Sequence, residues 1–144
     1  MSDDCTILIA EDEEDEAFLL KRALKKAAIS NSIHCVGNGE QVIDYLSGAG
    51  RFADRAQHPL PTVILLDLNM PKMNGFEVIA WIRQSPFKTL AIDVLSGSTR
   101  NEDILRALSL GANLYLKKPV TVAELESLLN GYRQVIAWRG FSRP

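Results

Sequence analysis

Residues 63–75 read VILLDLNMPKMNG, in which an apolar run ends abruptly at an aspartate and a loop. The first four residues are all apolar, which is typical of a short strand buried on both faces. Asp67 ends this run, and Pro71 and Gly75 bracket the loop that follows. Apolar residues at helical spacing begin at Phe76, so the segment predicts a strand, a loop and a helix in succession.

The same alternation of strand and helix extends in both directions along the chain. Short apolar runs predict strands, and segments with apolar residues three or four apart predict amphipathic helices. The predicted strands cover residues 5–10, 33–36, 63–66, 91–95 and 113–116, and the predicted helices cover residues 17–28, 40–46, 76–82, 101–110 and 121–138. Residues 47–62 predict a surface loop with room for a turn of helix. Thr121 followed by Glu124 is a capping-box pattern that starts the last helix.

Alternating strands and helices predict an α/β fold with a parallel sheet, because each parallel pair needs a crossover connection. We expect a three-layer (βα)5 sandwich of the flavodoxin-like class, with its five strands in the order 2-1-3-4-5. Alternation alone does not prove that order. We expect residues 1–138 to form a single domain and residues 139–144 to form a short tail, with no output domain after it.

Composition narrows the range of functions. The chain has 144 residues, 47% hydrophobic and 24% charged, with a net charge of −2, which is typical of a soluble globular domain. The chain has no excess of basic residues that would suggest a nucleic-acid partner. It also has no apolar run that would suggest a membrane span or a signal peptide. Cys5 and Cys35 each lie in an apolar run, and we interpret them as small core residues in a reducing compartment. We therefore expect a cytoplasmic protein.

Acidic residues follow two of the predicted strands. Ligands of open α/β sheets bind at the carboxyl ends of the strands, where Glu11 and Asp12 follow the first strand and Asp67 follows the third. Crowded carboxylates repel each other, and a hard divalent cation such as Mg2+ relieves that repulsion. We expect Asp12 and Asp67 to be direct ligands and Glu11 to act through water. The backbone carbonyl of Asn69 completes the predicted metal site.

The other strand ends carry groups that suit phosphoryl chemistry. An aspartate beside a metal can attack phosphorus to form an aspartyl phosphate, which makes Asp67 the candidate nucleophile. Lys118 follows the fifth strand, and its ammonium would stabilise the transferred phosphoryl oxygens together with the metal. Ser96 follows the fourth strand and would donate a hydrogen bond to a remaining oxygen. Gly97 leaves room for the phosphoryl group.

These residues carry a resemblance to a known family. The pieces ILIAED, VILLDLNMPKMNG, DVLSGS and LKKP together resemble the receiver domain of bacterial two-component response regulators, the CheY-like family. The resemblance covers residues 5–138 and is closest to stand-alone receivers that serve phytochrome kinases. It implies that Asp67 is the phosphoacceptor and that Lys118 is the phosphate lysine, with a cis bond to Pro119. It also implies that Ser96 and Tyr115 are the switch residues.

The resemblance also implies partners. The phosphoryl donor would be a histidine kinase, which could be of the phytochrome type, or a histidine phosphotransfer protein. Phosphorylation would then alter the face formed by residues 101–110, 113–116 and 121–138, which would control a protein partner. A homodimer through this face is a further prediction, based on late apolar residues of the last helix, namely Tyr132, Val135, Ile136 and Trp138. The alternative is that these residues simply cover the sheet.

Two other functions stay open at this point. A phosphohydrolase with an aspartate nucleophile would normally carry a second aspartate two residues later, where this chain has Asn69. A degenerate receiver would bind partners without phosphorylation, and Asp93 inside the fourth predicted strand leaves that alternative open. A buried carboxylate there would be costly unless it faces a polar neighbour or the strand is shifted. We interpret residues 13–16 as a charged helix start, and His34 and His58 as structural or surface residues.

Overall fold

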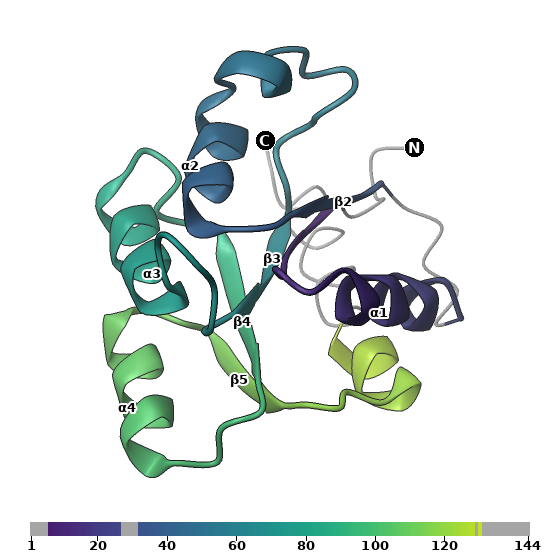
Figure 1. Cartoon of the computed structure of the whole chain (residues 1–144), viewed down its shortest axis with the longest axis vertical. Helices are drawn as coiled ribbons and strands as arrows, with labels where there is room; N and C mark the ends of the chain where they lie inside the picture. Colours follow the sequence, from purple (N-terminus) through teal and green to yellow (C-terminus); the bar gives the residue numbers. More distant parts are fainter. Residues whose placement is uncertain (1–5, 27–31, 129, 131–144) are drawn as a thin grey trace, which may run out of the picture.

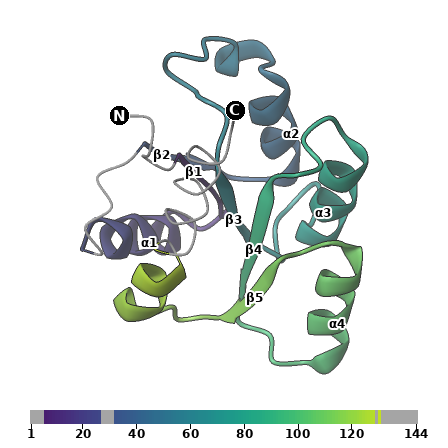
Figure 2. The same cartoon turned by 180° about the vertical axis from the view of Figure 1, so that it is seen from behind.

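The computed structural model of the chain describes residues 6–26, 32–128 and 130. Five parallel strands form one central sheet in the order β2-β1-β3-β4-β5. Helices α2, α3 and α4 cover one face of the sheet, and α1 with the last helical segment covers the other (Figures 1 and 2). This is the predicted three-layer, flavodoxin-like fold, and the predicted strand order is confirmed.

Predicted and observed elements agree closely in position. In chain order they are β1 (Ile7–Ala10), α1 (Glu14–Lys26), β2 (Ile33–Val36), α2 (Gly39–Ser47), a 3-10 turn (Gly50–Phe52), β3 (Val63–Asp67), α3 (Gly75–Gln84), β4 (Ala91–Ser96), α4 (Asn101–Leu110) and β5 (Leu114–Lys117). Residues 122–128 and 130 are helical, which agrees with the start of the predicted last helix. Cys5, the rest of that helix and the predicted tail lie outside the described residues.

The apolar runs form strands because both of their faces are covered. Every residue of β1 and β3 is buried, as a parallel sheet between two helical layers requires. Successive side chains point to opposite faces, so Leu8 packs in the core under α2, α3 and α4, whereas Ile7 and Ile9 pack in the core under α1. Two separate cores therefore fix the sheet from both sides.

The end of β3 is fixed by the helix that follows it. Asn74 caps α3, and its side chain and that of Glu77 form a reciprocal capping box. The Gly75 amide donates to the carbonyl of Leu68 at 2.9 Å. A Cβ on Gly75 would lie 2.7 Å from the carbonyl oxygen of Asp67, so only glycine lets the helix start pack this closely against the strand end.

Four local predictions are settled by the structure. The Lys118–Pro119 bond is cis, and the capping box of Thr121 and Glu124 is present. Asp93 lies inside β4 in register with Leu65 and Leu114, fully buried, so the alternative of a shifted strand is wrong. The prediction that Cys35 is a core residue is also wrong, because it is exposed on β2, which among the described residues pairs only with β1 at one edge of the sheet.

Candidate functional site

The predicted site residues gather at the carboxyl edge of the sheet. Asp67 is the last residue of β3 and Ser96 is the last residue of β4, while Glu11 and Lys118 come directly after β1 and β5. Glu11, Asp67 and Ser96 are all buried, with 7%, 7% and 0% of their surface exposed. Four neighbouring strands therefore deliver polar side chains to one place, which is the binding edge of an open α/β sheet.

Three carboxylates form a compact cluster at this edge. Glu11, Asp12 and Asp67 each offer a carboxylate oxygen, and these oxygens all lie within 4.8 Å of one another. Asp12 is exposed and the other two are buried, so the cluster is open to solvent on one side. The Asn69 amide donates to Asp67 Oδ1 at 3.3 Å, which keeps the backbone of residue 69 beside the cluster. Within the described ranges, no second group of three such side chains meets at this spacing.

The cluster is electrostatically suited to a cation. Burial, aided by the neighbouring Glu11 carboxylate, raises the pKa of Asp67 to about 7 although Lys118 opposes the rise. Ionising Asp67 is therefore unfavourable in the bare protein. A divalent cation reverses this cost, and oxygen donors from carboxylates suit Mg2+, so the residues present fit that metal.

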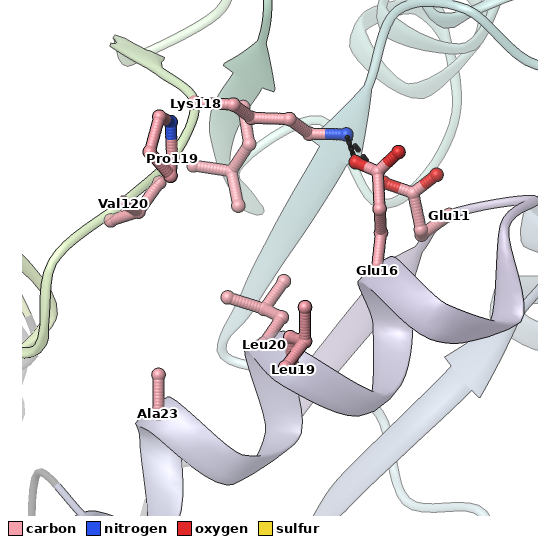
Figure 3. A pocket seen from close by; sticks show the side chains of 9 residues that line it. Glu11, Glu16, Leu19, Leu20, Ala23, Lys118, Pro119 and Val120 are labelled. Carbon is pink, nitrogen blue, oxygen red and sulfur yellow. Dashed lines mark hydrogen bonds and ion pairs between the residues drawn. The ribbon is translucent and has the colours of Figure 1, made fainter.

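Lys118 supplies a positive charge to the same cluster. Its ammonium donates to Glu11 Oε1 and to Glu16 Oε1 at 2.6 Å each, and lies 3.6 Å from Asp67 Oδ2 (Figure 3). Burial alone would lower the pKa of Lys118, but the bonds to Glu11 and Glu16 outweigh burial and raise it. The structure thus places Lys118, and not the exposed Lys117, at the site with its charge retained.

Glu16 is the contact that the sequence interpretation missed. The sequence pattern places it in the charged helix start of residues 13–16, yet its carboxylate reaches Lys118 from the first turn of α1. The hydrogen bond to Lys118 lowers the pKa of Glu16. Nothing in the run of six acidic residues distinguishes Glu16 from its neighbours, because the contact joins residues far apart in the chain.

The side chains of Ser96 and Tyr115 both contact the turn that follows β4. The Ser98 amide donates to Ser96 Oγ at 3.1 Å, and the Lys118 amide donates to the Ser96 carbonyl at 2.8 Å. A Cβ on Gly97 would meet no atom within 4 Å, so the space beside this turn is open. The half-buried Tyr115 donates its hydroxyl to the Ser98 carbonyl at 3.0 Å. The side chains of Ser96 and Tyr115 therefore both bond the backbone of Ser98.

The two histidines lie apart from this edge. Their rings are 5.9 Å apart, closer than their separation in the sequence suggested. Both also contact the ring of Tyr45, and His58 lies edge-on to Phe52. These ring contacts agree with the structural interpretation of His34 and His58.

No helix within the described residues has the length and apolar character that a bilayer crossing requires.

Comparison with known proteins gives a consistent result. The profile of the response regulator receiver domain matches residues 7–130. Response regulator Rcp1 of Synechocystis is 32% identical over 126 residues, which span 87% of this chain and 84% of that protein. The solved Mn2+-bound form of response regulator Rcp1 has a TM-score of 0.73 at 31% identity, covering 88% of this chain and 90% of that one.

Two further solved structures are similar. Response regulator RPA3017, in red light signalling of R. palustris, is 38% identical with a TM-score of 0.78 and covers 89% of this chain and 91% of its own. The phosphorylated cyanobacterial phytochrome response regulator RcpA is 30% identical with a TM-score of 0.76, covering 91% and 92%. Receiver domains are signalling domains that bind Mg2+ or Mn2+ through acidic residues, and the carboxylate cluster matches that property. The chain belongs to the response regulator receiver domain family.

Proposed function

We propose that this chain is a single-domain two-component response regulator that accepts a phosphoryl group on Asp67. The donor is a histidine kinase or a histidine phosphotransfer protein, and Mg2+ is bound during transfer. The observation that carries the proposal is the meeting of a buried Asp67 with two further carboxylates and the ammonium of Lys118. This combination provides a nucleophile, a cation site and a fixed positive charge in one place.

Each acidic residue has a separate part in binding the metal. Asp12 and Asp67 would coordinate Mg2+ directly, Glu11 would act through water, and the backbone carbonyl of Asn69 would supply another oxygen. Bound Mg2+ offsets the negative charge that collects where phosphoryl oxygens and carboxylates meet. The spacing of the Glu11, Asp12 and Asp67 oxygens supports this assignment, as does the solvent-open side at Asp12.

The chain's own residues then carry the transfer. A carboxylate oxygen of Asp67 attacks the phosphorus of a phosphohistidine, an O–P bond forms, and the P–N bond breaks as the imidazole leaves. Lys118 binds a phosphoryl oxygen through its ammonium, and the Ser96 hydroxyl donates to another. The catalytic contribution is positioning and charge stabilisation, as is usual for phosphoryl transfer.

The signal leaves through the face formed by α4, β5 and the last helix. Drawing Ser96 toward the phosphoryl group would shift the turn that holds the Tyr115 hydroxyl and allow Tyr115 to move inward. Apolar side chains are already exposed on this face, with Leu105 67%, Leu108 42% and Leu114 44% exposed. A protein partner or a second copy of the chain would cover them. The predicted dimer residues Tyr132, Val135, Ile136 and Trp138 lie outside the described residues.

Relatives suggest the kind of kinase and the setting. RcpA is a phytochrome response regulator and RPA3017 acts in red light signalling, so a phytochrome-type kinase is the proposed donor. We propose residues 1–138 as one receiver domain followed by the tail 139–144, located in the cytoplasm and without a nucleic-acid partner. The family match over residues 7–130 supports the receiver-domain part of this proposal.

The rival functions have less support. A phosphohydrolase would need an acid two residues after its nucleophile, and the structure has exposed Asn69 there. A receiver that works without phosphorylation has no need of a carboxylate cluster beside Lys118.

Intact mass spectrometry tests the proposal. The protein is incubated with acetyl phosphate and Mg2+, and the Asp67→Asn variant is treated in parallel. We expect a gain of one phosphoryl mass that needs Mg2+ and is absent from the variant. A gain that persists in the variant would move the acceptor elsewhere. No gain in the wild-type protein would favour the phosphorylation-independent alternative.

A further inference from the structure

The ammonium of Lys118 already donates hydrogen bonds to carboxylates in this structure. Its ammonium has three protons, and two of them are donated at 2.6 Å to Glu11 and Glu16. Asp67 Oδ2, at 3.6 Å, is within ion-pair range but beyond a good hydrogen bond. Any phosphoryl group on Asp67 must therefore compete with Glu11 and Glu16 for the same ammonium.

Glu11 and Glu16 are not equivalent competitors. The side chain of Glu11 is 5% exposed and belongs to the carboxylate cluster, so a bound cation would draw it away from the lysine. The side chain of Glu16 is 42% exposed, and Glu16 is not part of that cluster. Glu16 is thus the carboxylate that would still hold Lys118 once a metal is bound.

The Glu16–Lys118 contact also joins two parts of the fold. Glu16 extends from α1, and Lys118 extends from the segment after β5, toward one another across the mouth of an apolar cavity (Figure 3). The cavity has a volume of about 170 Å³ and is lined by α1 residues together with Leu95, Pro119 and Val120. The ion pair therefore connects α1 to this segment, beside the Asp67 carboxylate that would carry the phosphoryl group.

We propose that Glu16 is a positioning residue that holds Lys118 on the α1 side of the site until a phosphoryl group on Asp67 takes over the ammonium. The inference rests on the proposed phosphoacceptor function and adds a competitor to it. Glu16 stabilises the unphosphorylated state, because its charged hydrogen bond is made only there. Phosphorylation breaks that bond and so removes the ion pair that connects α1 to the segment after β5.

Equilibrium binding of beryllofluoride, a phosphoryl mimic, tests this role without enzymatic turnover. Binding is measured by fluorine NMR at saturating Mg2+ for the wild-type protein and for Glu16→Gln, Glu16→Asp and Glu14→Gln. The Glu16→Gln change weakens the competing bond, and we expect it to tighten beryllofluoride binding by about fivefold, or about 1 kcal/mol, the upper range for a partly exposed ion pair. Glu14 is exposed in the same helical turn, so Glu14→Gln is a matched loss of charge and should bind as the wild-type protein does.

The Glu16→Asp variant distinguishes the effect of a direct contact with Lys118 from a general effect of negative charge. Aspartate keeps the charge but is one methylene shorter, so it loses the 2.6 Å contact with Lys118. We expect it to bind beryllofluoride more tightly, like Glu16→Gln. Wild-type affinity in Glu16→Asp, or unchanged or weaker binding in Glu16→Gln, would overturn the inference while leaving the phosphoacceptor function intact. Absence of binding in the wild-type protein would overturn both.

Discussion

Replacing Asp67 by asparagine should stabilise the metal-free protein. Burial and the adjacent Glu11 raise the pKa of Asp67 from its ordinary 3.8 to about 7, so the ionised carboxylate is strained in the native state. The pKa difference alone corresponds to roughly 4 kcal/mol at full ionisation. The site is open to water at Asp12, and screening reduces this figure, so we expect a gain of about 1–2 kcal/mol for Asp67→Asn at about pH 8.

The gain should depend on pH in a definite direction. A native pKa raised above the unfolded value stabilises the fold below the unfolded pKa, and this contribution is lost as pH rises through the native pKa. Wild-type stability should therefore fall between about pH 4 and pH 7 relative to the variant, since asparagine does not titrate. Lys118 keeps its bonds to Glu11 and Glu16 in the variant, so no new unpaired charge offsets the gain.

Urea unfolding followed by circular dichroism measures this difference. Both proteins are unfolded with a chelator present, from about pH 5 to pH 8, and the difference in free energy of unfolding is plotted against pH. Mg2+ should then reverse the order, because ligand at one hundred times its Kd adds about 2.7 kcal/mol to the protein that binds it. A wild-type protein as stable as the variant at about pH 8, or a difference that does not shrink toward low pH, would refute the reasoning.

Two further outcomes follow from the same structure. Mg2+ affinity, measured by calorimetry, should rise as pH increases through about 7, because the metal must displace the proton held by Asp67; a flat profile would mean that Asp67 is not a ligand. Arg83→Ala should destabilise the fold by about 1–3 kcal/mol in urea unfolding, since the guanidinium donates to the carbonyls of Lys88, Leu90 and Gly111. Mg2+ affinity should be unchanged in that variant, and a loss of affinity would contradict a purely structural role.

Much of the fold could be predicted from local patterns. The runs that form β1 and β3 are apolar at every position because both faces are buried, and that pattern is visible in the sequence. The strand order depended on the flavodoxin-like analogy, because alternation fits several orders. Cys35 was misplaced for a related reason. A short apolar run does not reveal whether its strand lies at the centre or at the edge of a sheet, and β2 lies at the edge.

The site was predictable where its residues end strands. Asp67 and Ser96 end β3 and β4, Lys118 comes directly after β5, and parallel strands bring their carboxyl ends to one edge. Glu16 could not be found this way, because its partner lies 102 residues away and its helical neighbours are also acidic. Long-range pairing of a surface side chain leaves no periodic signal. His34 and His58 show the same limit, since only the fold brings their rings to 5.9 Å.

Under the proposed function, the carboxylate cluster is where a small chemical change would act on the domain. A proton on Asp67, the ammonium of Lys118 and a divalent cation are three ways to relieve the same repulsion, and a phosphoryl group adds negative charge that redistributes them. The fully buried β1 and β3 offer little freedom to respond. A response to the proposed phosphorylation would therefore pass through the polar strand ends. One is the turn whose backbone at residue 98 bonds both Ser96 and Tyr115, and the other is the Lys118 contact with α1, so the proposed phosphorylation of Asp67 would act on two separate surfaces.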